Sequence, residues 1–567
     1  MRSVPARAAL LGALFAAFVT LPGLGVGTLW DNSETAYGEV AREIVLSHDW
    51  VVMHLNGQPW FVQPPLYFWL AALCANVFGF TPLALRLPSA LATIVMGGAV
   101  GYATARIAGG RAGTVAAVVL STSLMQAIVG RLAIMDALLD LGVALSVLWF
   151  YRAFEPSGTM RRRDTAFFCG ALALAVGTLA KGPVAPVMAL LIVGLWLVWE
   201  RRAGRLAAPR PVAVALSAAL YLALTLPWYV ALAARVGPSA VTELIGHYTV
   251  GRYTGVIENQ HGPLWYYIPV VILGFFPWIA FLPVAVVSAI RTARDPRGGF
   301  TRFVLTWAAI PFLFFSFAGT KLPNYVALLL PALAILVALW FADVFAGAMR
   351  RAALISAATI PAFIACVAFA LAVFSRTNSL ESVMAALGGQ LAFLGATMLI
   401  GSLITVAVMA RRDTIGWSPY VLALTSGALV LFIAFIGEPA AEAFKPIPPL
   451  ARTIQALRMT GDIVGIHSVS GGNALLFYTT PPVRVINRDV DFYATICPAG
   501  RAWIVAAPAE AVRFTQLARD VGRSADVVAD APSGPQPRAS LLHVFGAPCN
   551  KAVATRLISQ LRRRRLQ

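Results

Sequence analysis

The chain has 567 residues, of which 59% are hydrophobic and 12% are charged, and its mean hydropathy is +0.76. This composition excludes a soluble globular protein and indicates a polytopic α-helical membrane protein. The net charge of +19 does not indicate nucleic-acid binding, because the excess arginines lie in loops between apolar segments, as the positive-inside rule requires.

About thirteen apolar segments approach the ~20 residues that a helix needs to cross a bilayer. The first, Ala8 to Leu29, is interpreted as an uncleaved span, because no A-x-A cleavage pattern precedes Trp30. The predicted spans are residues 8–29, 83–105, 112–130, 136–151, 165–180, 183–199, 211–234, 264–290, 302–318, 323–344, 352–374, 387–410 and 417–437.

The loops between these spans are of two chemical kinds. One kind is rich in arginine, and these loops contain Arg106, Arg152, Arg201, Arg291, Arg350 and Arg411. All of them fall on one side of the membrane if the N-terminus is cytoplasmic and about thirteen spans are present. The other kind holds most of the carboxylates, histidines and lysines, and therefore lies on the outer face.

The segment from Pro65 to Phe80 is apolar enough to suggest a further span. Counting it would move the arginines of the following loops to the outer face. The sequence therefore favours an interfacial or half-inserted helix, opened by Pro64-Pro65 and rich in aromatic residues.

After Gly437, short alternating apolar runs surround a helical pattern from Ala509 to Val521, which predicts a small α/β domain. We expect a membrane domain at 1–438, with outer loops at 30–82 and 235–263, and an outer domain at 439–567. Cys497 and Cys549 could form a disulfide if this domain faces an oxidising compartment.

Directly after the first span, helical spacing places Asp31, Glu34 and Thr35 on one face and Glu39 and Glu43 one turn apart. A carboxylate at the membrane boundary is suited to act as a general base, because partial desolvation raises its pKa. The alternative is an ordinary solvated juxtamembrane helix, which other polar residues on the same face make less attractive.

Those other residues include Asp136 at the outer end of a span, Asp140 one turn deeper, and Lys181 between two apolar segments. Carboxylates and lysines inside a membrane are costly and usually functional. The remaining candidates are His247, Arg252, Lys321 and Tyr325. Carboxylates and cations that converge on one face suggest a phosphorylated, lipid-anchored substrate.

The polar residues belong to a series of short motifs along the chain. In order, they are Trp30 to Glu43, Asp49-Trp50, Leu55-Asn56-Gly57, Phe61, Pro64-Pro65-Leu66-Tyr67, Arg86-Leu87-Pro88-Ser89, Asp136, Lys181-Gly182, His247 with Arg252, Gly274-Phe275-Phe276-Pro277-Trp278, and Lys321-Leu322-Pro323-Asn324-Tyr325. This order resembles that of the bacterial members of the protein O-mannosyltransferase-like GT-C glycosyltransferases, in particular the lipid A aminoarabinose transferases. The resemblance covers residues 8 to about 345 well and the later part only in architecture.

The resemblance implies transfer of a sugar from a polyprenyl phosphate, normally undecaprenyl phosphate, at the periplasmic face of the bacterial inner membrane. The acceptor would be lipid A, another envelope glycan or a protein. By position, Glu34, Tyr37 and Asp136 match the family's acidic motif, its following tyrosine and its second acid. Residues around the donor phosphate and the cavity are matched by Lys181, His247, Arg252 and Tyr325.

The chain departs from the family pattern at three positions. Ser33 replaces the first member of the usual Asp-Glu pair, so Asp31 and Glu34 are joint candidates for the catalytic carboxylate. Gln63 replaces a lysine that contacts the donor phosphate in the aminoarabinose transferases, and Val62 replaces a glutamate that binds zinc in some relatives. These changes argue against a zinc site and weaken the case for the aminoarabinose donor. No cofactor is expected, and a requirement for a divalent metal stays open.

Two other classes of function stay open. A transporter or flippase of a lipid-linked saccharide would also use charged residues in the membrane. The chain has no internal repeat of the kind common in transporters, which favours the enzyme. A family member that binds lipid without catalysis is the third possibility.

Overall fold

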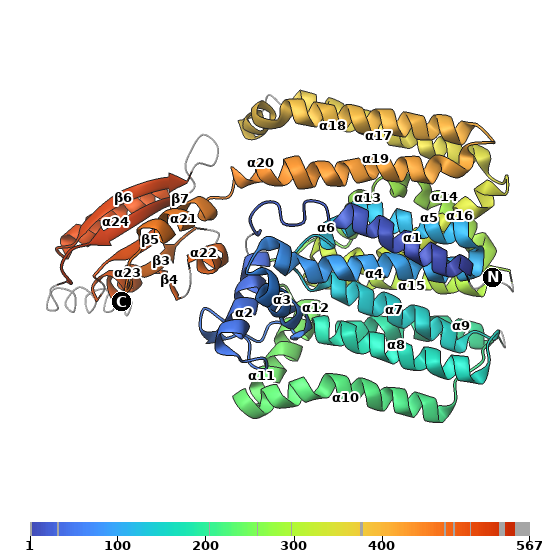
Figure 1. The fold of residues 1–567 in the computed structure, drawn as a ribbon, viewed down its shortest axis with the longest axis horizontal. Helices are drawn as coiled ribbons and strands as arrows, with labels where there is room; N and C mark the ends of the chain where they lie inside the picture. Colours follow the sequence, from blue (N-terminus) through green and yellow to red (C-terminus); the bar gives the residue numbers. More distant parts are fainter. Residues whose placement is uncertain are drawn as a thin grey trace. The chain divides into compact units, whose positions relative to one another are not determined.

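The computed structural model describes residues 3–30, 33–202, 205–257, 259–295, 298–374, 378–469, 472–479, 482–498, 500–531 and 539–549. The chain forms two compact units (Figure 1). We call them the membrane unit, which comprises Met1–Gly25, Trp50–Val52 and Phe61–Phe435, and the α/β unit, which comprises Val26–Asp49, Met53–Trp60 and Ile436–Gln567.

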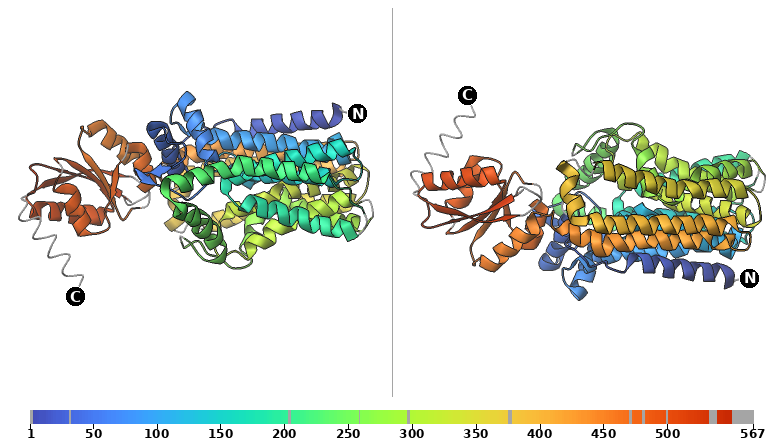
Figure 2. Two further views of the ribbon diagram at one scale, coloured as in Figure 1. Left: turned by 90° about the horizontal axis from the view of Figure 1, so that it is seen from below. Right: turned by 90° about the horizontal axis from the view of Figure 1, so that it is seen from above.

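The membrane unit is helical throughout and its long helices run along a common axis (Figures 1 and 2). Its elements are α1 (Ser3–Thr20), α3 (Leu66–Phe78), α4 (Pro82–Ala108), α5 (Gly110–Thr122), α6 (Leu124–Val129), α7 (Asp136–Phe154), α8 (Met160–Lys181), α9 (Val184–Arg202), α10 (Pro211–Val236), α11 (Pro238–Thr242), η1 (Glu243–Gly251), α12 (Arg252–Thr254), α13 (Tyr267–Gly274), η2 (Trp278–Phe281), α14 (Leu282–Ala293), α15 (Gly299–Ser316), η3 (Pro323–Leu329), α16 (Leu330–Phe345), α17 (Arg350–Phe374), α18 (Asn378–Ala410), η4 (Ile415–Trp417) and α19 (Ser418–Phe432).

Among the described residues, eleven helices are long and apolar enough to cross a membrane. A twelfth span results if α13 and the η2–α14 segment, bent by 109° at their break, count as one. The predicted span at 112–130 is helical too, but extended backbone at Ser123 divides it into α5 and α6, each too short to cross alone. The chain is therefore a multi-pass membrane protein. The first predicted span, residues 8–29, is too long, because α1 ends at Thr20 and the residues from Leu21 to Trp30 form turns and irregular backbone.

Helix α3 has 13 residues, which gives a length of about 20 Å, short of the ~30 Å hydrocarbon core. This agrees with the prediction that residues 65–80 do not form a full span. The neighbouring segment Trp50–Val52 joins the membrane unit because the indole of Trp69 donates to the Trp50 carbonyl and that of Trp228 to the Val51 carbonyl.

Small residues allow close packing of the first helices. A Cβ at Gly113 of α5 would lie 2.4 Å from the Gly101 oxygen of α4, and one at Gly101 would lie 2.9 Å from the Ala8 oxygen of α1. Helices in membranes gain from such close backbone approach, because the lipid supplies no hydrophobic driving force between them.

The arginine-rich loops gather at one end of the helices. Three ion pairs connect them: Arg106 with Glu155, Arg210 with Asp164, and Arg302 with Glu200. The guanidinium of Arg111 also lies 5.5 Å from the Phe345 ring, which joins the start of α5 to the end of α16. The marked N-terminus lies at this end (Figure 2), so the predicted grouping of these loops holds within the membrane unit.

The C-terminal part of the α/β unit contains a five-stranded sheet of order β4-β3-β5-β7-β6. Strands β3 (Ile463–His467), β4 (Val483–Val485) and β5 (Ala502–Ala506) are parallel, and β7 (Ala539–Phe545) pairs antiparallel with β5 and β6 (Ser524–Ala531). Its helices are α20 (Glu438–Glu442), α21 (Ile447–Leu457), α22 (Gly472–Thr479), α23 (Asp489–Ile496) and α24 (Pro508–Asp520).

Side chains alternate across β5, so the sheet contributes to two cores. Ile504 packs with Phe492 and Phe514 of α23 and α24, while Trp503 packs with residues of α21 and α22. The structure also pairs Cys497 with Cys549 in a disulfide, as the sequence allowed. The basic run Arg562–Arg565 lies outside the described residues.

The segment after the first span also belongs to the α/β unit. It forms α2 (Glu34–Ser47) and a small hairpin of β1 (His54–Leu55) and β2 (Gln58–Pro59). Asn56 exchanges two hydrogen bonds with the backbone of Val483. The predicted boundary at residue 438 is thus crossed by a segment that the sequence assigned to outer loops of the membrane domain.

Candidate active site

Glu34, the first predicted carboxylate, is the first residue of α2 and is only 1% exposed. Its Oε2 accepts a hydrogen bond of 2.8 Å from the backbone N–H of Trp30. Tyr37 is half-buried one turn later, with its ring edge toward Trp60 at 6.1 Å between centroids. Asp31 lies outside the described residues.

The other two carboxylates of α2 contact the unit that surrounds them. Glu39 is fully buried and forms an ion pair with Arg42, whose guanidinium donates to the Phe477 carbonyl. Burial raises the pKa of Glu39 to about 7, against the opposing effect of Arg42. Both oxygens of Glu43 accept from the Gly57 N–H at 3.1 Å. Glu39 and Glu43 therefore hold α2 and the hairpin in place.

In the membrane unit, Asp136 and Lys181 form the centre of a polar cluster. Asp136 begins α7 and Lys181 ends α8, and the Lys181 Nζ donates to Asp136 Oδ1 at 2.5 Å. Asn324 donates to the same oxygen at 2.7 Å, and Lys181 Nζ lies 5.1 Å from the centroid of the Tyr325 ring. Three sequence-predicted residues, Asp136, Lys181 and Tyr325, are therefore in contact.

Asp140 lies one turn further along α7 and is only 2% exposed. Among the described residues, its Oδ2 has no hydrogen-bond partner. Two buried carboxylates, Asp136 and Asp140, therefore share the ammonium group of Lys181. Binding of an anion at this cluster would need a further cation, because Lys181 already balances one of these carboxylates.

The turn after Lys181 brings two more predicted segments close. Gly182 has a φ of +73°, a conformation that favours glycine. A Cβ at this position would lie 3.7 Å from Pro64 Cγ and 3.9 Å from Thr249 Oγ1. Pro64 follows the buried Gln63, and Thr249 lies in η1, two residues after the exposed His247. The segments that contain Gln63 and His247 therefore approach the turn after Lys181.

Arg252 and Lys321 come from segments joined by backbone hydrogen bonds, since the Thr320 N–H donates to the Arg252 carbonyl at 3.0 Å. Arg252 is half-buried. Lys321 is 6% exposed, and its Nζ donates to the carbonyls of Ser316 and Ala318 at the end of α15. Because Lys321 caps this helix, its contacts favour a structural role over phosphate binding.

Sequence reasoning missed Asn324, although it lies inside the quoted Lys321–Tyr325 motif, and it missed Trp30 as the partner of Glu34. The signal for Asn324 was its position between Lys321 and Tyr325, because the motif already supplied a cation and a phenol as candidate site groups. For the second, the signal was the position of Trp30 four residues before Glu34, one helical turn away.

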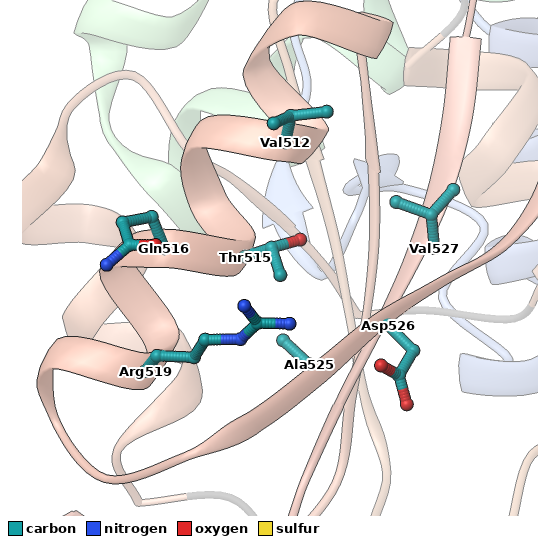
Figure 3. Close-up of a pocket in the computed structure, with 7 residues that line it drawn as sticks. All are labelled: Val512, Thr515, Gln516, Arg519, Ala525, Asp526 and Val527. Carbon is teal, nitrogen blue, oxygen red and sulfur yellow. The ribbon is translucent and has the colours of Figure 1, made fainter.

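Among the described residues, no three His, Cys, Asp or Glu side chains lie close enough together to hold a metal ion. A surface hollow of about 330 Å³ lies between α24 and β6 and is lined by residues such as Thr515, Arg519 and Asp526 (Figure 3). None of the predicted site residues is among those that line it.

Residues 62–230 match the sequence model of the family described as dolichyl-phosphate-mannose-protein mannosyltransferase. An undecaprenyl phosphate-alpha-4-amino-4-deoxy-L-arabinose arabinosyl transferase of Edwardsiella ictaluri is 32% identical over 321 residues, which are 56% of each chain. A second arabinosyl transferase of this name, from Proteus mirabilis, is 31% identical over 59% of each chain. The matches thus span less than two thirds of these relatives.

Two solved structures have similar folds. ArnT from Cupriavidus metallidurans bound to undecaprenyl phosphate aligns with a TM-score of 0.78 and 22% identity, over 94% of this chain and 97% of that one. The archaeal oligosaccharyltransferase AglB from Archaeoglobus fulgidus aligns with a TM-score of 0.51 and 10% identity, over 90% of this chain and 70% of that one. The GT-C fold predicted from the sequence is therefore confirmed, and residues 62–230 carry the pattern of the dolichyl-phosphate-mannose-protein mannosyltransferase family that the motifs resemble.

Proposed function

We propose that this chain is a membrane glycosyltransferase that transfers a sugar from a polyprenyl phosphate, of the undecaprenyl type, to an acceptor at the outer face of the bacterial inner membrane. The observation that carries the proposal is the Asp136–Lys181–Asn324–Tyr325 cluster at one end of α7 and α8. The cluster lies in a fold that the chain shares with an enzyme crystallised with undecaprenyl phosphate. The sequence relatives of the chain are named arabinosyl transferases.

The leaving group of such a reaction is a lipid phosphate, which gains negative charge as the sugar departs. Preorganised cations are the usual means of stabilising this charge. Lys181 and Arg252 are the cations that we assign to this role. Asp136 would act mainly by orienting Lys181, since their ion pair leaves this carboxylate poorly suited to be a free base. Lys321 is less suited to the role, because carbonyl groups already surround its ammonium.

We assign Glu34, together with Asp31, to the acceptor. A buried carboxylate at the start of a helix can orient or deprotonate an attacking hydroxyl. If the acceptor is itself a phosphate, no base is required and the carboxylates would only position it. Tyr37, His247 and Gln63 would line the sugar and phosphate sites.

The proposed orientation has a cytoplasmic N-terminus and an α/β unit in the periplasm. The grouping of the arginine loops at one end of the membrane unit supports it through the positive-inside rule. The Cys497–Cys549 disulfide supports it independently, since disulfides persist in oxidising compartments.

Mass spectrometry of lipid A, envelope glycans and periplasmic proteins tests the proposal, with cells that contain the wild-type chain, no chain, or the Lys181→Met variant. A sugar-sized mass that is lost without the chain and with K181M identifies the acceptor and supports the reaction. If all pools keep their masses while polyprenyl-phosphate sugars stop crossing the membrane, the chain is a transporter. The double variant D31N/E34Q tests the acceptor site, and full retained activity would contradict its assignment.

A further inference from the structure

The residues just before Glu34 are held by side chains from the segment that follows α19. The Thr28 N–H donates to Glu442 Oε1 at 2.8 Å, and the Thr28 hydroxyl donates to the same carboxylate. Lys445 Nζ donates to the Thr28 carbonyl at 2.9 Å and to Glu442 Oε1 at 2.7 Å. We call Thr28, Glu442 and Lys445 the Thr28 bracket. It binds both backbone polar groups of one residue.

The next two residues are fixed as well. The Leu29 N–H donates to the Tyr478 hydroxyl at 2.8 Å. The Trp30 N–H donates to Glu34, its indole donates to Glu438 Oε1 at 3.0 Å, and Lys445 Nζ lies 4.2 Å from the centre of its ring. Three consecutive backbone N–H groups thus have side-chain acceptors, although this stretch belongs to no helix or strand.

The far side of Glu34 is anchored too. Helix α2 continues to Arg42, whose guanidinium donates to the Phe477 carbonyl at 2.7 Å and to the Leu476 carbonyl at 3.2 Å. These carbonyls belong to the last turns of α22 and need partners there. Glu34 therefore lies between two attachment points, and the polar partners of both come from residues beyond 436.

We infer that Lys445 and Glu442 are positioning residues of the transferase site. They fix Thr28 to Trp30 so that the Trp30 N–H holds the Glu34 carboxylate in one orientation. The inference rests on the proposed function, and it gives the segment after the last predicted span a part in the reaction. Holding a reacting group within a fraction of an ångström is worth large factors in rate, and a displacement of about 1 Å can cost ~100-fold.

The test uses the full chain with Lys445→Met, Lys445→Arg and a matched control, Arg501→Met. Arg501 also belongs to the α/β unit, pairs with a carboxylate, Asp462, and lies over an indole, Trp503. Its other contacts are with His543 and the Leu457 carbonyl, which also lie outside the segment 26–34. R501M therefore reproduces the loss of an ion pair and a cation–π contact without disturbing the Thr28 bracket.

Three quantities are measured for each variant: amide hydrogen exchange at residues 28–30, the sugar-modified product in cells, and the affinity of the purified chain for undecaprenyl phosphate. We expect K445M to speed exchange at 28–30 and to lower product ~10- to 100-fold, with unchanged affinity for undecaprenyl phosphate. K445R should keep exchange slow and retain most of the product. R501M should match the wild type at these residues and in product.

Unchanged exchange at 28–30 in K445M would overturn the positioning role, whatever the activity. Faster exchange with full product would overturn its link to the reaction. If K445M and R501M lower the product equally, the effect of Lys445 is on the stability of the α/β unit in general and not on the position of Glu34. A wild-type chain that makes no product and does not bind undecaprenyl phosphate would refute the proposed function and this inference's catalytic part, and exchange would still decide whether Lys445 orders the segment.

Discussion

Lys181 Nζ lies 2.5 Å from Asp136 Oδ1, so the last residue of α8 is joined to the first residue of α7. Both side chains are mostly buried, with 15% and 5% of their surfaces exposed. Their charges compensate each other in a place where an isolated charge would be costly. The pair therefore has two effects, to stabilise the end of the helical hairpin and to hold an ammonium in a fixed position.

Lys181→Met should destabilise the protein, because it leaves Asp136 buried without its cation. It should also abolish transfer, because the ammonium group assigned to the leaving phosphate is lost. The expected loss is about 3–5 kcal/mol, as for other buried pairs that lose one partner. The double variant D136N/K181M should recover most of this stability and none of the activity. Thermal unfolding in detergent and product analysis in cells measure the two effects. A K181M protein as stable as the wild type would contradict the buried-pair interpretation.

Asn324→Leu should weaken the same cluster without removing a charge. Its amide donates to Asp136 at 2.7 Å, and a hydrogen bond to a charged group contributes about 1.5–3 kcal/mol. We expect reduced transfer with undecaprenyl phosphate binding largely kept, because Lys181 remains. Isothermal titration calorimetry with undecaprenyl phosphate measures the binding, and product analysis in cells measures the transfer. Loss of binding with intact fold would instead make Asn324 a direct phosphate ligand.

The pairing of Asp136 with Lys181 shows what the sequence could and could not predict. Apolar periodicity predicted both helices, and their polar ends were expected on one face. Contact between two residues 45 positions apart depends on how the helices pack. A Cβ at Gly142 would lie 2.5 Å from the Gly177 nitrogen, so these glycines permit the close approach of α7 and α8.

Other features were not predicted from the sequence. Lys321 was expected to bind phosphate from its residue type, and the sequence did not show that its ammonium group donates to carbonyls three and five residues earlier, at the end of α15. Thr28 and Glu442 are 414 residues apart, so nothing in the sequence around Glu34 predicted its attachment to the C-terminal segment. The break at Ser123 was missed, although three consecutive hydroxyl residues, Ser121 to Ser123, interrupt the apolar segment there.

Arg302→Met should destabilise the membrane unit much more than Arg210→Met does. The Arg302–Glu200 pair has 3% and 4% of its side chains exposed, and Arg302 also donates to the Ala293 and Asp295 carbonyls at 2.8 Å. Its loss should cost about 3–5 kcal/mol. The Arg210 side chain is 57% exposed in its pair with Asp164, and its loss should have little effect on stability because solvent screens this pair.

Thermal unfolding of the two arginine variants in the same detergent provides the comparison, and product analysis in cells should show transfer in both as long as the protein is folded. Equal shifts in unfolding temperature would mean that burial does not set the strength of these pairs. If R302M is folded and transfer is lost, the end of the membrane unit that carries the arginine-rich loops takes part in the reaction.

Glu39→Gln should change how stability depends on pH. The pKa of Glu39 is raised from 4.5 to about 7 in the folded chain, because burial disfavours the carboxylate more than Arg42 favours it. Between these values the folded state binds more protons than the unfolded state, so this group makes stability fall as pH rises from about 4.5 to about 7. Above pH 7 both states carry the carboxylate and the slope ends. The glutamine variant cannot ionise, so its unfolding temperature should decline less than that of the wild type between pH 5 and pH 8.

Scanning calorimetry of the full chain measures the unfolding temperature of both proteins across this pH range. Glu442→Gln, which alters a different carboxylate of the α/β unit, serves as the control and should keep the wild-type slope across this window. Parallel curves for E39Q and the wild type would mean that Glu39 is ionised throughout and that Arg42 outweighs the cost of burial.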